Sequence, residues 1–236
     1  MITTTIRETG LSNAEFLERY SKAGRIGLAG GWTLIDKLIC RAERHVDQNK
    51  EWSKWSHAFL FQGIRVDGCH WVLESDLQLK RKHILLGVQE NRVSKYHDEV
   101  VYPCLAVVDF DLPSPTTQTI LTEALELVAN KTRYSLRELV GALISLKKQD
   151  LRQEENLLSR DKSFFCSAFV HHVFRKAGMD LAPGLSVKNT TPADLSRSPI
   201  PHTLYLLERD RPQSIRRRFK ARVRGRIKAL SGEELT

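Results

Sequence analysis

The sequence predicts an α+β protein in which a small antiparallel sheet packs against helices. Apolar residues alternate with a period of two in the first half of the chain, as in strands that bury one face. In the second half they recur at the spacing of amphipathic helices. The chain has 236 residues, 41% of them hydrophobic, which suits one substantial core. We therefore expect one domain over 1–205 and a basic tail over 206–236.

Two helices are predicted in the N-terminal part. The segment Ser12–Lys22 opens with a capping box formed by Ser12 and Glu15, and apolar residues follow at helical spacing. The run GLAGG at 27–31 predicts a glycine-rich break. Apolar residues at helical spacing return over Thr33–Glu43, so a second helix is expected there.

The middle of the chain predicts strands. His57 shares one strand face with the phenylalanines two and four residues further on, while the residues between them face the other side. The segment His70–Leu77 is expected to pair with this strand. Val100–Phe110 is apolar enough for a strand buried on both faces. Pro103 complicates that interpretation, because a central strand needs every backbone donor.

The second half predicts helices. Thr116–Ala129 carries an apolar stripe, and a capping box at Ser135 opens another helix that runs through Ile144. The charged stretch Lys147–Lys162 fits either an exposed helical extension or a surface loop. The apolar stripe over Ser163–Gly178 predicts a core helix that stops at its glycine.

The chain has four cysteines without a CxxC pair or a compact Cys/His set, which argues against a structural zinc site. In a reducing compartment they are expected to be free thiols. Three of them, Cys40, Cys69 and Cys104, fit the role of small apolar residues. Cys166 differs because it falls in the first turn of the predicted helix, at the third helical position if Ser163 is the N-cap.

That placement of Cys166 favours a nucleophile. Unpaired N–H groups and the positive end of the macrodipole stabilise a thiolate in the first turn of a helix. The backbone N–H of Cys166 is also well placed to stabilise an oxyanion. The alternative is a core cysteine on the same helix.

A cysteine nucleophile needs a base, and His57 is the best candidate because its strand can bury and aim the ring. The alternative is a histidine that serves only in the core or at a sheet edge. His171 and His172 lie too close to Cys166 along the same helix. The remaining histidines lie in more polar surroundings.

Glu74, on the partner strand, is the candidate that orients His57. A tight turn at Asp67-Gly68 sets Glu74 opposite Phe61, whereas a wider loop sets it directly across from His57. An intermediate register presents Asp76 instead. A surface carboxylate is the alternative for Glu74.

Five ordered segments carry a resemblance to a known family: SHAFLF, WVLES, TRYS, FFCSAFVHHVFRKAG and TPADLSRSP. Together they resemble the circularly permuted NlpC-like branch of the papain superfamily, the YiiX-like hydrolases, in which the His strand precedes the Cys helix. The resemblance spans Gly30 to Pro201, and it implies that 1–205 is a permuted papain-like catalytic domain. It implies Cys166 as nucleophile, His57 as base and Glu74 as the third polar residue.

The resemblance also implies that Tyr134 lines the substrate site, although a partly buried structural tyrosine fits equally well. The implied chemistry is acyl transfer through a thioester, which requires no metal and no organic cofactor. Substrates of this superfamily branch are peptides and other amides, or lipid acyl esters in forms similar to lecithin:retinol acyltransferase. The residues do not choose between a hydrolase and a transferase.

The net charge of +9 comes from the tail, because ten Lys or Arg and one Asp lie between Arg209 and Lys228. The tail also carries apolar residues at helical spacing (Ile215, Phe219, Val223, Ile227 and Leu230), a pattern that suits an anionic membrane surface. Nucleic-acid binding is a competing use, but the nearly neutral body makes nucleic acid an unexpected partner. A tail that is solvated, with its stripe packed on the body, is the third alternative.

The start of the chain shows no signal-peptide pattern, and the sequence has no apolar run long enough to span a membrane. We expect a cytoplasmic protein, peripheral at a membrane if the tail binds one. A papain-like binding module without catalysis, working through its basic tail, is the alternative function.

Overall fold

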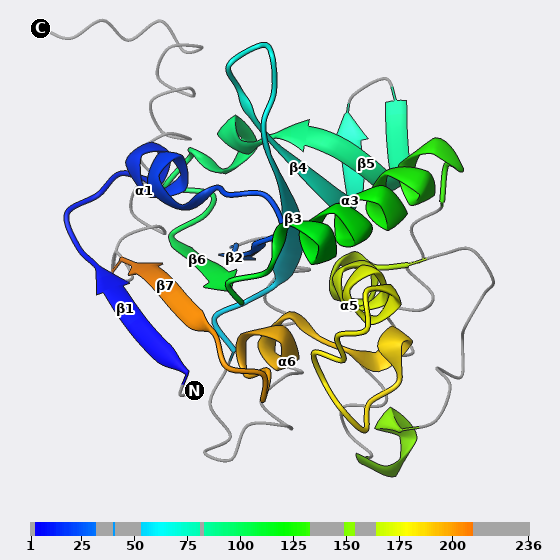
Figure 1. The fold of residues 1–236 in the computed structure, drawn as a ribbon. Coiled ribbons are helices and arrows are strands. Elements are labelled where there is room, and N and C mark those ends of the chain that lie inside the picture. The colour runs from blue at the N-terminus through cyan, green and yellow to red at the C-terminus, as the bar shows by residue number, and fades with distance from the viewer. Residues whose placement is uncertain are drawn as a thin grey trace, which may run out of the picture.

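The computed structural model describes residues 3–31, 40, 53–80, 83–132, 149–153 and 164–209. Within these residues, seven strands form one sheet in the order β1-β7-β6-β2-β3-β4-β5 (Figure 1). Edge strand β1 is parallel to β7, and the other five neighbouring pairs are antiparallel. The strands are β1 Thr4–Glu8, β2 Ile26–Gly30, β3 His57–Ile64, β4 His70–Lys80, β5 His83–Arg92, β6 Cys104–Asp109 and β7 Thr203–Glu208.

Helices cover both faces of the sheet. One face carries α3 Ser114–Ala129, α5 Cys166–Lys176 and α6 Pro192–Ser196, which pack with Ala58 and Leu60 of β3. The other face carries α1 Asn13–Tyr20 and the 3-10 turn η1 Val93–Tyr96, which pack with Phe59 and Phe61. Two further 3-10 turns are η2 Gln149–Arg152 and η3 Val187–Asn189. Because both faces are covered, β3 is nearly continuously apolar.

The α+β class is confirmed, but the sheet is larger than expected and contains a parallel pair. The predicted glycine-rich break is wrong, because most of that run forms β2, a buried strand between β3 and β6. The reason is packing: a Cβ added at Gly27 would lie 2.0 Å from the Phe59 ring. Gly27 therefore gives room to an aromatic ring from the neighbouring strand.

Several predicted elements are confirmed. The capping box of Ser12 and Glu15 opens α1, and the helix expected over Thr116–Ala129 is α3, which begins two residues earlier. The expected strand pair is β3 and β4. The strand expected over Val100–Phe110 is β6, but it begins only after Pro103, so the proline removes no donor from the ladder. Its residues are buried through Val108.

Other predictions fall partly or wholly outside the described residues. These are the helices expected over Thr33–Glu43 and from Ser135 through Ile144, and most of the charged stretch Lys147–Lys162, in which η2 is described. Strand β7 continues to Glu208, past the domain boundary expected after residue 205. Among the described residues, no helix combines the length and the apolar character that crossing a membrane requires.

We predict that Gly27→Ala destabilises the fold by about 1–3 kcal/mol, because the new methyl group collides with the Phe59 ring. Urea unfolding of the two proteins measures this cost. In a Phe59→Leu background the colliding ring atoms are gone, so the same glycine substitution should cost much less. An equal cost in both backgrounds would contradict this packing argument.

Candidate active site

Cys166 is the first residue of α5. Phe165 is the N-cap, with extended backbone angles φ −92° and ψ 173°, so the expectation that Ser163 caps the helix is wrong. The helix starts later because its first closing hydrogen bond runs from the N–H of Phe169 to the carbonyl of Phe165. The N–H of Cys166 therefore belongs to the first turn, where backbone donors have no acceptor within the helix.

Two buried hydroxyl groups fix the start of α5. Ser167 Oγ donates to the carbonyl of Thr190 at 2.8 Å. Ser75 Oγ of β4 donates to the carbonyl of Phe164 at 2.6 Å. Phe165 is also buried, with 1% of its surface exposed. The helix entrance is thus tied both to the sheet and to the segment after η3, which holds the sulfur in place.

His57 connects the cysteine to an acid. It is the first residue of β3, and its Nε2 lies 2.6 Å from Oε2 of Glu74. The thiol of Cys166 lies close enough to the imidazole to raise the pKa of His57. Since Nε2 is engaged by Glu74, Nδ1 is the nitrogen left for the thiol. The three residues singled out in the sequence therefore meet, although they come from β3, β4 and α5.

The surroundings of His57 favour its charged form. Burial lowers the pKa of His57, but the hydrogen bond and charge of Cys166, followed by those of Glu74, raise it to about 10. An imidazolium is therefore the favoured form of this ring at neutral pH. An imidazolium beside a cysteine stabilises the thiolate, which is the reactive form of the side chain.

The observed register of β3 with β4 differs from the two registers that would set Glu74 opposite Phe61 or opposite His57. Leu60 pairs with Leu73, and a bulge follows between Phe61 and Gly63. If this intermediate register is continued along β4, Asp76 lies opposite His57. The hydrogen bond of the imidazole is nevertheless made with Glu74, two residues earlier on the same strand. Asp76 is instead bound by Lys95 Nζ at 2.6 Å.

Three further residues surround Glu74, and the sequence analysis missed them. Oε1 accepts hydrogen bonds from Asn91 Nδ2 and Lys95 Nζ, both at 2.7 Å, and Oε2 accepts one from the Tyr96 hydroxyl at 2.5 Å. Burial raises the pKa of Glu74, but Lys95 and then His57 lower it far below its usual value. Local periodicity does not mark Lys95 and Tyr96, since their shared partner Glu74 lies 21 and 22 residues earlier in the chain.

The other histidines of α5 have separate partners. His171 lies between Thr190 Oγ1 at 2.6 Å and Asp180 Oδ1 at 2.9 Å, and it is completely buried. His172 lies 3.1 Å from Glu123 of α3. Each of these histidines is therefore held by partners other than Cys166. Tyr134, the expected substrate-lining residue, lies outside the described residues.

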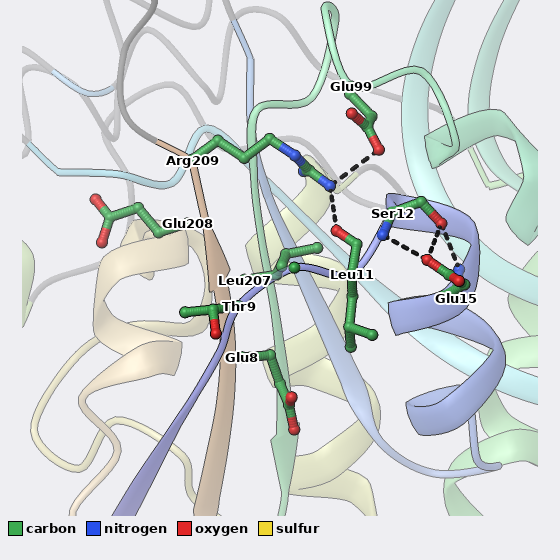
Figure 2. Close-up of a pocket in the computed structure, with 10 residues that line it drawn as sticks. Glu8, Thr9, Leu11, Ser12, Glu15, Glu99, Leu207, Glu208 and Arg209 are labelled. Atoms are coloured by element: carbon green, nitrogen blue, oxygen red, sulfur yellow. Dashed lines mark hydrogen bonds and ion pairs between the residues drawn. The ribbon is translucent and has the colours of Figure 1, made fainter.

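A pocket of about 480 Å³ lies away from these residues, where β1 leads into α1 beside the end of β7. In Figure 2, Arg209 reaches from the end of β7 toward Glu99 and the carbonyl of Leu11. Neither Cys166 nor His57 lines this pocket. Its carboxylates are already engaged, as the contacts of Glu99 illustrate, so we assign no ligand to it.

We predict that the stabilising effect of His57 disappears at alkaline pH. Its folded-state pKa is raised from 6.5 to about 10, so its contribution is fully present below pH 6.5 and is lost as the pH rises toward 10. Urea unfolding of the wild type and His57→Gln between pH 6 and 10 tests this. The difference in unfolding free energy should shrink with rising pH. Parallel curves would contradict the assignment.

Comparisons with known proteins concern the fold. No family model matches the sequence, and a search of curated proteins found no match. Among solved structures, the chain is similar to the "metalloprotein yiiX from Escherichia coli O157:H7, DUF1105", with 14% sequence identity and a TM-score of 0.50. The match covers 81% of this chain and 98% of that chain.

The word metalloprotein in that description applies to the neighbour. In the ranges that the structure describes, no three His, Cys, Asp or Glu side chains are grouped so as to hold a metal ion. At 14% identity the likeness concerns architecture alone. The chain therefore has a YiiX-like α+β fold.

Proposed function

We propose that this protein is a cysteine-dependent hydrolase or acyltransferase of the permuted NlpC type within the papain-like fold. The observation that carries the proposal is the meeting of Cys166, at a helix start, with His57, whose other nitrogen lies 2.6 Å from Glu74. A nucleophile, a base that can reach it and an acid that orients the base are the parts that covalent acyl transfer needs.

In the first step, the Cys166 thiolate attacks the carbonyl carbon of an amide or ester. The carbonyl oxygen gains negative charge, and the N–H of Cys166 at the start of α5 is available to stabilise it. The imidazolium of His57 then gives its proton to the leaving amine or alcohol. A thioester on Cys166 remains, and His57 is neutral.

In the second step, neutral His57 takes a proton from water, and the oxygen of that water attacks the thioester. The acid product leaves, and the thiolate and imidazolium are restored. If an alcohol or amine replaces water, the same steps transfer the acyl group. Throughout the cycle Glu74 accepts the N–H of Nε2 and keeps the ring oriented toward the sulfur.

The substrate class follows from this chemistry. A thiol nucleophile without a required cofactor suits peptides, other amides and lipid esters, and we propose that the substrate is one of these. A panel of amide, thioester and phospholipid substrates separates them when wild type and Cys166→Ala are compared. Turnover of one class that is lost in Cys166→Ala identifies the reaction.

We predict that iodoacetamide alkylates Cys166 at pH 7 about tenfold faster than it alkylates a free cysteine. The physical reason is the imidazolium next to the sulfur, since a free thiol is only a few per cent ionised at this pH. Peptide mapping by mass spectrometry assigns the label. A small reagent is needed because only 3% of the Cys166 surface is exposed.

Two controls make this labelling specific. His57→Ala should abolish the acceleration, whereas His70→Ala removes a histidine from the start of β4, where it contacts Ser21, and should leave the rate unchanged. Cys104 is an internal reference, because burial raises its pKa to about 12. Slow labelling that is independent of His57 would favour the alternative, a binding module without catalysis.

We further propose that the basic tail that follows β7, 209–236, binds an anionic membrane surface and brings the enzyme to it. The support is the sequence pattern of basic residues around an apolar helical stripe. Replacing Arg216, Arg217 and Arg218 by Gln should weaken binding to phosphatidylserine vesicles about a hundredfold, at about 1 kcal/mol for each charge. Co-sedimentation measures this, with neutral vesicles as control. Binding to duplex DNA but not to vesicles would contradict the membrane proposal.

A further inference from the structure

We propose that Lys95 and Tyr96, on the 3-10 turn η1, are positioning residues of the catalytic site, which act on His57 by fixing Glu74. This inference rests on the proposed function, since it assigns a role within the same site. Neither residue contacts Cys166 in any hydrogen bond of the described residues. Their influence therefore has to pass through the carboxylate.

The geometry accounts for both oxygens of Glu74. Oε1 accepts from Lys95 and Asn91, and Oε2 accepts from Tyr96 and His57. A carboxylate has about four acceptor positions, so these four donors fill it. With every position occupied, the carboxylate has one orientation, and that orientation directs Oε2 at the imidazole.

The burial of this group explains why so many donors are present. Glu74 has no exposed side-chain surface, and a buried charge without partners is strongly destabilising. Among the described residues, Lys95 is the one cation besides His57 that pairs with Glu74, and 22% of its side chain is exposed. Because Lys95 Nζ also binds Asp76 at 2.6 Å, the lysine is held from two sides.

Tyr96 contributes shape as well as a hydrogen bond. Its ring is completely buried, stacks on Phe59 with ring centres 4.2 Å apart, and lies 6.3 Å from the His57 ring. The hydroxyl thus reaches Glu74 from a rigid aromatic wall beside the imidazole. Burial, together with the charge of Glu74, raises the pKa of Tyr96, so this hydroxyl remains a donor at working pH.

The titratable groups around Glu74 set the direction of the expected effect. In the described part of the chain they are His57 on β3, Asp76 on its own strand β4, Lys95 on η1, and the neutral hydroxyl of Tyr96 beside it. Lys95 is the largest influence that lowers the pKa of Glu74 against burial. Without this lysine, Glu74 takes up a proton at a higher pH and no longer supports the imidazolium.

The test is the pH profile of Cys166 alkylation by iodoacetamide in the full chain. In Lys95→Met the acid limb should move upward by about one pH unit, which is about a tenfold lower rate on that limb. Lys95→Arg restores the positive charge and should recover most of the loss. Lys54→Met removes a lysine from an exposed ion pair with Glu208 and should leave the profile unchanged.

Tyr96→Phe keeps the aromatic wall and removes only the hydroxyl, and it should lower the rate several-fold. Circular dichroism and thermal unfolding establish that each variant is folded. A folded Lys95→Met with the wild-type acid limb would overturn the proposal. If Lys95→Met does not fold, a wild-type rate in Tyr96→Phe overturns it. Failure of the proposed function looks different, because wild-type labelling is then slow and independent of His57.

Discussion

The burial of one ionised carboxylate is the constraint on which the rest of this site depends. Glu74 has no contact with solvent, so its charge has to be balanced by donors within the protein. Four side chains meet this requirement, and His57 is one of them. The contacts that stabilise the buried charge of Glu74 therefore also orient the imidazole toward Cys166. One set of hydrogen bonds both stabilises the carboxylate and fixes the position of the His57 ring.

The sheet is what brings these groups together. β3 supplies His57 and β4 supplies Glu74, while η1 follows directly after β5, the next strand in the sheet. A bulge in β3 fixes the register so that Glu74 reaches its histidine diagonally instead of from the directly opposite position. From the other face, Ser75 ties the start of α5 to β4. Two consecutive residues of β4 thus hold His57 on one side of the sheet and the start of α5 on the other.

The sequence predicted this site better than it predicted the sheet. Cys166 and His57 could be found because a helix start and a strand face are visible in local periodicity. Glu74 could be named, but the choice between it and Asp76 depended on a bulge that no local pattern marks. Lys95 was missed because it lies on η1 while its partners lie on β4. Strand β2 was missed because Gly27 makes room for the ring of Phe59, which lies more than thirty residues away in the chain. In each case the deciding contact is long-range.

The arrangement of formal charges links this network to the protonation of His57. Glu74 and Asp76 contribute two negative charges and Lys95 one positive charge, so the cluster carries one net negative charge next to His57. An imidazolium neutralises that charge, which agrees with the raised pKa of His57. Without Asp76, Lys95 would cancel Glu74 and weaken the attraction for a protonated ring. Without Lys95, burial would favour the neutral acid. The charge on the His57 ring is thus balanced by a cluster in which the lysine and both carboxylates take part.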